Sequence, residues 1–361
     1  MNATVQTPAP ALATFNPDSP RELRDAWHAL TAQKSLRIRD AAQQLGVAEA
    51  QLLATGIGEH VVRLQGDWRD LMMRMGELGP VMALTRNDAA VHEKDGVYTN
   101  ISHGEHVGLV LGDAIDLRLF YDKWTFGYAV TETTGTLTRR SFQFFDACGD
   151  AVHKIYLRDA SDLFVWDALC EAWAAPVQIA GEKVLPRPDA RPAERPDDEI
   201  DLAAFQADWR AMRDTHQFFG LLKKHDLSRT QAFRLIGTEF ATPLHIDAPA
   251  RLLQGAAEAG TDIMIFVGNP GCIQIHSGPV KDIQRMGPWI NVLDPGFNLH
   301  LREDLVAQAW RVKKPTADGI VTSIEIFDAA GKQIAYFFGK RKPGIPETPG
   351  WRTLAESLET R

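Results

Sequence analysis

A single histidine interrupts an apolar pattern between residues 201 and 225, where the spacing predicts a helix. The apolar positions follow one another at steps of four, three, four and three, and they are Phe205, Trp209, Met212, His216 and Phe219. This spacing places their side chains on one buried face. An imidazole there is either a core histidine bonded to a carbonyl group or an axial ligand to iron in a hydrophobic pocket. The helix by itself favours the core histidine, because most buried polar groups are simply hydrogen-bonded.

Arg118 is a second candidate for chemistry, and it lies in the predicted strand AIDLRLF at residues 114–120. Side chains alternate along a strand, so Asp116, Arg118 and Phe120 share one face. A single arginine on a strand most often faces solvent. An arginine beside an aromatic ring in the middle of a sheet also suits a pocket in which a bound anion or a polarised oxygen needs a fixed donor.

Two further groups of residues carry weaker signals. The segment HEKDGVYTNISHGEH at residues 92–106 contains potential metal ligands, but predicted strands and turns do not align them as a helix face would. Basic residues near the C-terminus could, together with Arg229, receive a pair of carboxylates. They are Lys313, Lys314, Lys340, Arg341 and Lys342. No GxGxxG motif follows a predicted strand, so a Rossmann nucleotide site is not expected.

The composition is that of an ordinary globular protein, since 45% of the 361 residues are hydrophobic and 24% are charged. A net charge of −8 argues against a general nucleic-acid surface, which needs clustered lysines and arginines. Cys148, Cys170 and Cys272 form no CxxC pattern, which favours a reducing compartment. No apolar run approaches the length of a membrane span, and the first 20 residues fit no signal sequence. We therefore expect a cytoplasmic protein that is not embedded in a membrane.

Helical and strand-like patterns alternate twice along the chain, which predicts an α+β protein. Short helices between residues 21 and 76 precede a meander of antiparallel strands between 79 and 157 and a closing helix. The same order returns after a segment rich in proline and charge. We predict a disordered leader at 1–20, a first repeat at 21–175, a linker at 176–200, a second repeat at 201–351 and a C-terminal tail at 352–361.

The second repeat is a copy of the first at a constant offset. SFQFFDACGDAVHKIYL at 141–157 matches SIEIFDAAGKQIAYFFG at 323–339, and subtracting the positions of the shared aspartates, 146 from 328, gives 182. One ungapped shift through helices and strands indicates duplication of a whole domain. At this offset His216 lies over Lys34, Arg118 over His300, and Arg229 over Val47. The shared fold therefore does not require the candidate site residues.

Long motifs in both repeats resemble those of one protein family. They are RNDAAVHEKDGVYTN, HVGLVLGDAIDLRLF, DTHQFFGLLKKH, GPWINVLDPGFNLHL and KKPTADGIVTSIEIFDAAGKQIA, and the resemblance extends from about Arg21 to Trp351. Together with the duplication, they make the chain similar to the HemS/ChuS-type intracellular hemin-binding and hemin-degrading proteins of bacterial heme-uptake systems. By this resemblance, heme b (iron protoporphyrin IX) lies in a cleft between the two halves.

The resemblance also implies roles for the candidate residues at the iron. His216 is the proximal iron ligand by this resemblance, and Arg118 lies over the distal face with Phe120 beside it. These positions agree with their chemistry, because a neutral histidine supplies a nitrogen ligand and an arginine stabilises negative charge that develops on oxygen. His216 and Arg118 are thus the expected catalytic pair.

The same resemblance assigns the residues at the propionates of the heme. Arg229, Lys314 and Arg341 match family positions that contact the propionates. Two neighbouring positions depart from the family pattern. Tyr336 stands where a glutamine is found, and Phe338 stands where a tyrosine hydroxyl helps to hold a propionate. The departures predict a weaker or rearranged anchoring of the propionates.

Two functions use such a pocket, and the sequence leaves both open. One is an enzyme that opens the macrocycle oxidatively, with electrons from an external reductase, and releases iron. The other is a carrier that takes heme from an inner-membrane importer to a separate heme oxygenase. A third class, an interaction protein whose sheets bind a partner and no cofactor, fits the family resemblance poorly.

Overall fold

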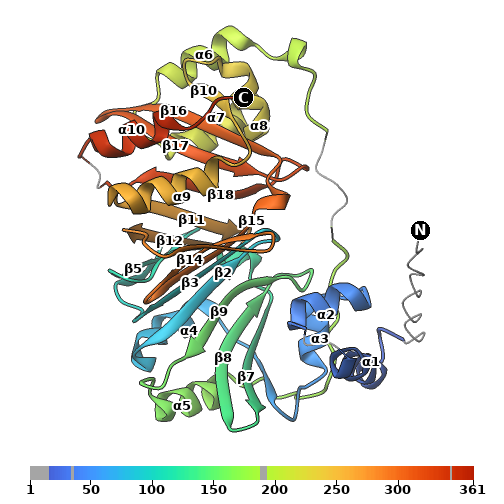
Figure 1. Cartoon of the computed structure of the whole chain (residues 1–361). Helices are drawn as coiled ribbons and strands as arrows, with labels where there is room; N and C mark the ends of the chain where they lie inside the picture. The colour runs from blue at the N-terminus through green and yellow to red at the C-terminus, as the bar shows by residue number, and fades with distance from the viewer. Residues whose placement is uncertain (1–15, 34–35, 188–192, 342–343) are drawn as a thin grey trace, which may run out of the picture.

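The structure, a computed structural model, describes residues 16–33, 36–187, 193–341 and 344–361. These residues form two nine-stranded antiparallel sheets with helices packed around them, which confirms the predicted α+β class (Figure 1). Residues 1–15 of the predicted leader lie outside the described residues, as do Lys34 and Lys342.

The elements of the two halves follow one another in the same order. The first half contains the helices α1 (Pro20–Gln33), α2 (Ile38–Leu45), α3 (Glu49–Ala54), α4 (Trp68–Met73) and α5 (Leu163–Trp173), and the strands β1 (Val61–Leu64), β2 (Val81–Arg86), β3 (Ala90–Gly96), β4 (Ile101–His103), β5 (Gly108–Leu111), β6 (Asp116–Leu119), β7 (Phe126–Thr134), β8 (Leu137–Phe145) and β9 (Ala151–Leu157). The second half contains the helices α6 (Leu202–Arg210), α7 (Gln217–His225), α8 (Arg229–Ile236), α9 (Ala248–Ala259) and α10 (Pro349–Ser357), and the strands β10 (Ala241–Leu244), β11 (Ile263–Asn269), β12 (Cys272–Gly278), β13 (Ile283–Met286), β14 (Trp289–Asp294), β15 (Phe297–Arg302), β16 (Gln308–Thr316), β17 (Gly319–Phe327) and β18 (Gln333–Gly339).

The strands of the second half repeat those of the first at the predicted offset. The strands β16, β17 and β18 begin and end 182 residues after β7, β8 and β9. The strand β12 follows β3 at the same distance, since subtracting 90 from 272 also gives 182. Coinciding boundaries over four strands confirm the duplication.

Each sheet contains strands from both halves of the chain. Sheet 1 has the order β1-β7-β8-β9-β2-β3-β15-β14-β13, and sheet 2 has the order β10-β16-β17-β18-β11-β12-β6-β5-β4. The junctions are the antiparallel pairs of β15 with β3 and of β6 with β12. Figure 1 shows the orange strands β14 and β15 beside the blue strands β2 and β3. Each half therefore completes the sheet of the other with three strands.

The two sheets share a buried interior, and helices cover the remaining faces. Val267 and Phe337 of sheet 2 belong to one hydrophobic core with Leu299 of sheet 1 and with residues of α9 and α10. Leu117 and Leu119 of β6 belong to a second core that includes α4 and α5. On the outer face of sheet 2, the helices α6, α7 and α8 cover only one end, over β10, β16 and β17. The rest of that face has no helical cover in the described part of the chain.

The predicted helix at 201–225 is wrong in its middle, where the chain forms two helices joined by a turn. Phe205, Trp209 and Met212 are buried as predicted. His216, however, has 92% of its side chain exposed, and Phe219 is 77% exposed. Side chains in the turn bond to nearby backbone N–H groups and so compete with helical hydrogen bonds. Both residues therefore lie outside the predicted buried face of the helix.

The linker and the tail are held against the domains more tightly than their composition indicates. In the linker, Glu182 accepts a hydrogen bond from the hydroxyl of Tyr128 at 2.6 Å, and Gln178 bonds to the backbone of Arg63. In the predicted tail at 352–361, α10 buries Ala355 in the hydrophobic core that contains Val267 and Phe337. The boundary at residue 351 therefore cuts through a helix.

A cut in the linker tests the exchange of strands between the halves. We expect a protein cleaved at a protease site inserted within residues 188–192 to remain one particle in size-exclusion chromatography. The reason is that each sheet keeps three strands from the other fragment. Denaturant should separate the fragments, which serves as the control. Separation into two folded species in native buffer would contradict the interleaved topology.

Candidate functional site

The uncovered part of the outer face of sheet 2 carries three of the predicted site residues, Arg118, Tyr336 and Phe338. Residues opposite each other in an antiparallel pair point to the same side of a sheet, as do residues two apart in a strand. The registers Arg118↔Ile273, Ile273↔Gly268, Phe266↔Tyr336 and Tyr336↔Glu325 therefore place all these residues on one face. We call this surface the open face; the partly buried side chains on it are Arg118, Phe266, Ile273, Tyr336 and Phe338.

Aromatic rings form the floor of the open face. Phe266 stacks on Tyr336 with a centroid distance of 4.7 Å, and the ring of Phe338 meets them at 5.3 and 5.8 Å. Burial raises the pKa of the Tyr336 phenol to about 12, so the hydroxyl is neutral at physiological pH. Three strand spacings, about 14 Å, separate β18 from β6 across this floor. A surface of this width and composition suits a large, flat and mainly apolar ligand.

Glu325 is the centre of a buried charged cluster at the edge of the floor. Its carboxylate accepts hydrogen bonds from Lys314 Nζ at 2.5 Å and Ser323 Oγ at 2.9 Å, and it lies 3.0 Å from Arg229 Nε. Burial raises the pKa of this carboxyl, but the charges of Arg229 and Lys314 outweigh burial and hold the pKa below its ordinary value. Two cations thus share one anion, which leaves positive charge next to the open face.

Arg229 joins this cluster to the aromatic floor. Its guanidinium carbon lies 4.9 Å from the ring centre of Phe218 and 5.7 Å from that of Tyr336. About a third of the Arg229 side chain is exposed, at 30%, so it can still reach an anion. Lys314, in contrast, is buried behind Phe218, with its ammonium 4.6 Å from the ring centre. Lys314 is therefore too buried to contact a ligand on the open face, and it contributes only its positive charge.

Arg341 has a free hydrogen-bond donor beside the turn that carries His216. Its Nη2 lies 3.9 Å from Asp318, while its buried Nη1 has no hydrogen-bond partner in the part of the chain that the structure describes. Hydrogen bonds from His216 lower the pKa of the Asp214 carboxyl, and the charge of Arg341 adds to this effect. A buried N–H group without a partner favours the binding of an anionic or polar ligand.

Arg118 lies on β6, at the side of the aromatic floor opposite β18, and is held by its own strand. Its guanidinium forms an ion pair with Asp116 and donates from Nη1 to the carbonyl of Leu117 at 3.1 Å. Burial raises the pKa of the Asp116 carboxyl, although the Arg118 charge acts against this. Phe120 follows the end of β6 and donates its backbone N–H to Gly271 at 3.0 Å. Arg118 is thus an oriented cation near the floor.

His216 stands in the turn between α6 and α7 and presents its imidazole to solvent. Its Nδ1 lies 2.6 Å from Oδ1 of Asp214, and the same oxygen accepts the backbone N–H of His216 at 2.8 Å. Because Nδ1 faces this carboxylate, Nε2 is the ring nitrogen left for a ligand. Two residues further on, Phe218 contacts Arg229 and Lys314, which places the turn next to the charged cluster.

Other predicted candidates lie elsewhere. His92 belongs to β3 of sheet 1 and His103 belongs to β4 of sheet 2, so the segment at 92–106 is divided between the sheets. Within the described residues, no group of three or more His, Cys, Asp or Glu side chains is arranged to hold a metal ion. Lys313 pairs with Glu356 and Lys340 pairs with Asp262, each in an exposed ion pair.

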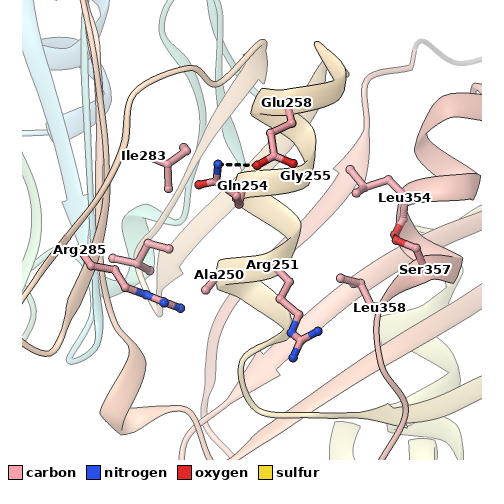
Figure 2. Close-up of a pocket in the computed structure, with 11 residues that line it drawn as sticks. Ala250, Arg251, Gln254, Gly255, Glu258, Ile283, Arg285, Leu354, Ser357 and Leu358 are labelled. Carbon is pink, nitrogen blue, oxygen red and sulfur yellow. Dashed lines mark hydrogen bonds between the residues drawn. The ribbon is translucent and has the colours of Figure 1, made fainter.

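A cavity of about 460 Å³ lies between α9, α10 and the hairpin of β13 and β14. Figure 2 shows Gln254 of α9 donating a hydrogen bond to Glu258, with Leu354 of α10 nearby. A second cavity of about 760 Å³ lies between α1 and the strands β7 and β8. None of the predicted site residues lines either cavity. The candidate site therefore lies outside these two cavities.

Sequence reasoning missed several residues of the site. Glu325 had a detectable signal, because it is the one acidic residue in the apolar strand SIEIF at 323–327. Asp214 also had one, since an aspartate two residues before a histidine commonly bonds to the backbone in a turn. Phe266 had no comparable signal, because its neighbours across the sheet depend on the register of distant strands.

The duplicated frame agrees with a known class of proteins. The family described as "Haemin-degrading HemS.ChuX domain" matches residues 46–173 and 226–358, so one domain of this kind is found in each half. The chain therefore belongs to this family. Among the described helices, none is both long and apolar enough to cross a membrane.

Similar proteins share nearly the whole chain. The hemin transport protein HmuS of Yersinia pestis is 42% identical over 316 residues, which cover 87% of this chain and 90% of HmuS. The crystal structure of holo-PhuS, a heme-binding protein from Pseudomonas aeruginosa, is 48% identical with a TM-score of 0.92, covering 95% of this chain and all of that one. ChuS, an E. coli heme oxygenase, is 38% identical with a TM-score of 0.83, covering 93% and 99% of the two chains.

Replacing Glu325 tests the charged cluster. We expect Glu325→Ala to lower the free energy of unfolding by about 3–5 kcal/mol, because it leaves two cations beside an empty buried position. Urea denaturation measures this loss. The control is Glu303→Ala, which breaks an exposed ion pair with Arg285 and should cost at most about 1 kcal/mol. Equal losses of unfolding free energy in the two variants would contradict the conclusion that Glu325 is the buried anion shared by Arg229 and Lys314.

Proposed function

We propose that this chain binds heme b on the open face of sheet 2, with Nε2 of His216 as the ligand to iron. The observation that carries the proposal is the exposed imidazole of His216, which is 92% accessible and whose Nδ1 already faces Asp214. An aromatic floor of Phe266, Tyr336 and Phe338 gives the macrocycle an apolar surface. The names of HmuS and PhuS, a hemin transport protein and a heme-binding protein, support this choice of ligand.

The propionates of such a heme require cations at the edge of the floor. Arg229 lies between Phe218 and Tyr336 with part of its side chain exposed, and Nη1 of Arg341 has no hydrogen-bond partner among the described residues. Lys314 adds positive charge from behind Phe218. No hydroxyl is available at Phe338, so the two arginines carry the contact in this chain.

For the reaction, we propose oxidative opening of the heme macrocycle, which releases iron and consumes dioxygen and electrons from an external reductase. His216 holds the substrate by its iron. Arg118 supplies an oriented positive charge at the edge of the floor formed by the other half, where it can stabilise negative charge that develops during oxidation. Phe120 and the rings of the floor exclude water. The name of ChuS as a heme oxygenase supports this function.

A non-catalytic carrier is the second candidate function. The name of HmuS as a hemin transport protein favours it, and so does the openness of the site, since a surface site releases its ligand more easily than an enclosed one. Such a carrier would take heme from an inner-membrane importer to a separate oxygenase. For either function we propose a cytoplasmic location and a role in iron acquisition; the three free cysteines are consistent with a reducing compartment.

The test of heme binding is the variant His216→Ala. We expect its affinity for ferric heme to fall by more than about tenfold, because even residues that only orient a ligand contribute 10- to 100-fold. Its ferric absorption spectrum should also change. His245→Ala is the matched control, since His245 is also exposed and its Nδ1 also faces an aspartate, at 2.7 Å. Equal affinity and spectra for His216→Ala and the native chain would refute the proposed ligand.

Turnover separates the enzyme from the carrier. The native heme complex is incubated in air with ascorbate and catalase, and its Soret band and iron release are followed. An enzyme should lose the band, release iron and form a defined tetrapyrrole product, and Arg118→Ala should slow this reaction while heme still binds. A stable spectrum would contradict the enzymatic function and leave the carrier. Loss of colour only without catalase would show coupled oxidation by peroxide.

A further inference from the structure

The turn that presents His216 also holds a carboxylate against its imidazole. Oδ1 of Asp214 lies 2.6 Å from Nδ1 of His216 and accepts the backbone N–H of the same residue at 2.8 Å. An ionised carboxylate has no proton to donate, so the hydrogen of this contact belongs to Nδ1. The tautomer of His216 is thereby fixed, with its lone pair on the solvent-facing Nε2.

The position of Asp214 is itself determined by neighbouring residues. Oε1 of Gln217 accepts the backbone N–H groups of Arg213 at 2.8 Å and Asp214 at 3.2 Å. The carbonyl of Arg213 accepts the N–H of Ala317, in the turn between β16 and β17, at 2.9 Å. The turn is therefore tied to sheet 2, and the carboxylate is in place before any ligand arrives.

We infer that Asp214 is a positioning residue that fixes the ring nitrogen with which His216 binds iron and makes that nitrogen a stronger electron donor. This inference rests on the proposed function. A carboxylate that accepts Nδ1–H raises the basicity of the ring, as such partners do for metal-bound histidines. A more basic ligand stabilises ferric iron relative to ferrous iron and so lowers the reduction potential of the heme.

The variant Asp214→Asn tests this inference in the full-length chain loaded with ferric heme. It keeps the size of the side chain and an oxygen that can accept the backbone N–H of His216, but it removes the negative charge. We expect the preference for ferric over ferrous heme to fall about tenfold, which raises the midpoint potential by about 59 mV for a one-electron couple. The iron–histidine stretching band in the resonance Raman spectrum of the ferrous complex should move to lower frequency.

Asp247→Asn is the matched control for this experiment. Asp247 faces Nδ1 of His245 at 2.7 Å, also two residues away, but it belongs to an ion pair with Arg251 outside the site. The control should leave the midpoint potential and the stretching band of the heme complex unchanged. Asp214→Ala should change both in the same direction as Asp214→Asn.

Two results would overturn the inference in distinguishable ways. A complex that depends on His216 but has the same midpoint potential and stretching band in Asp214→Asn as in the native chain would show that Asp214 only stabilises the turn. A native complex without an iron–histidine band would instead refute the proposed function, and the inference with it.

Discussion

The antiparallel pairing of β6 with β12 is the contact on which the candidate site depends. It inserts a strand of the first half into the sheet of the second half, with Leu119 opposite Cys272 and Arg118 opposite Ile273. Because Leu117 and Leu119 enter a hydrophobic core, the alternation of the strand turns Arg118 to the open face. A residue of the first half thus lies on the same face of sheet 2 as Phe266 and Tyr336.

Duplication supplies the frame of the site, whereas the side chains that carry its chemistry differ between the two copies. At the offset of 182 residues, Glu325 corresponds to Gln143, and Tyr336 corresponds to Lys154. Lys154 in sheet 1 is buried and pairs with Glu49 at 2.6 Å, so a salt bridge occupies the place of an aromatic ring. The two halves therefore keep the same strands but present different surfaces.

Local patterns were sufficient to predict the fold class and most of the elements. Alternation along strands such as 323–327 and the constant offset depend on neighbouring residues, so the fold class and the duplication were predicted correctly. The break between α6 and α7 was not predicted from the apolar spacing. The side chains of Asp214 and Gln217 accept hydrogen bonds from backbone N–H groups, and these bonds replace the helical ones. The exchange of β6 was missed as well, since strand pairing across more than 150 residues leaves no periodic signal.

The central claim is that the exposed imidazole of His216 binds heme iron above the aromatic floor of sheet 2. A crystal structure of the ferric heme complex tests this claim most directly. We predict Nε2 of His216 bonded to the iron, the macrocycle lying over Phe266 and Tyr336, and Arg229 within reach of a propionate. A macrocycle held in the cavity between α9 and α10, or an iron bonded to another histidine, would contradict the claim.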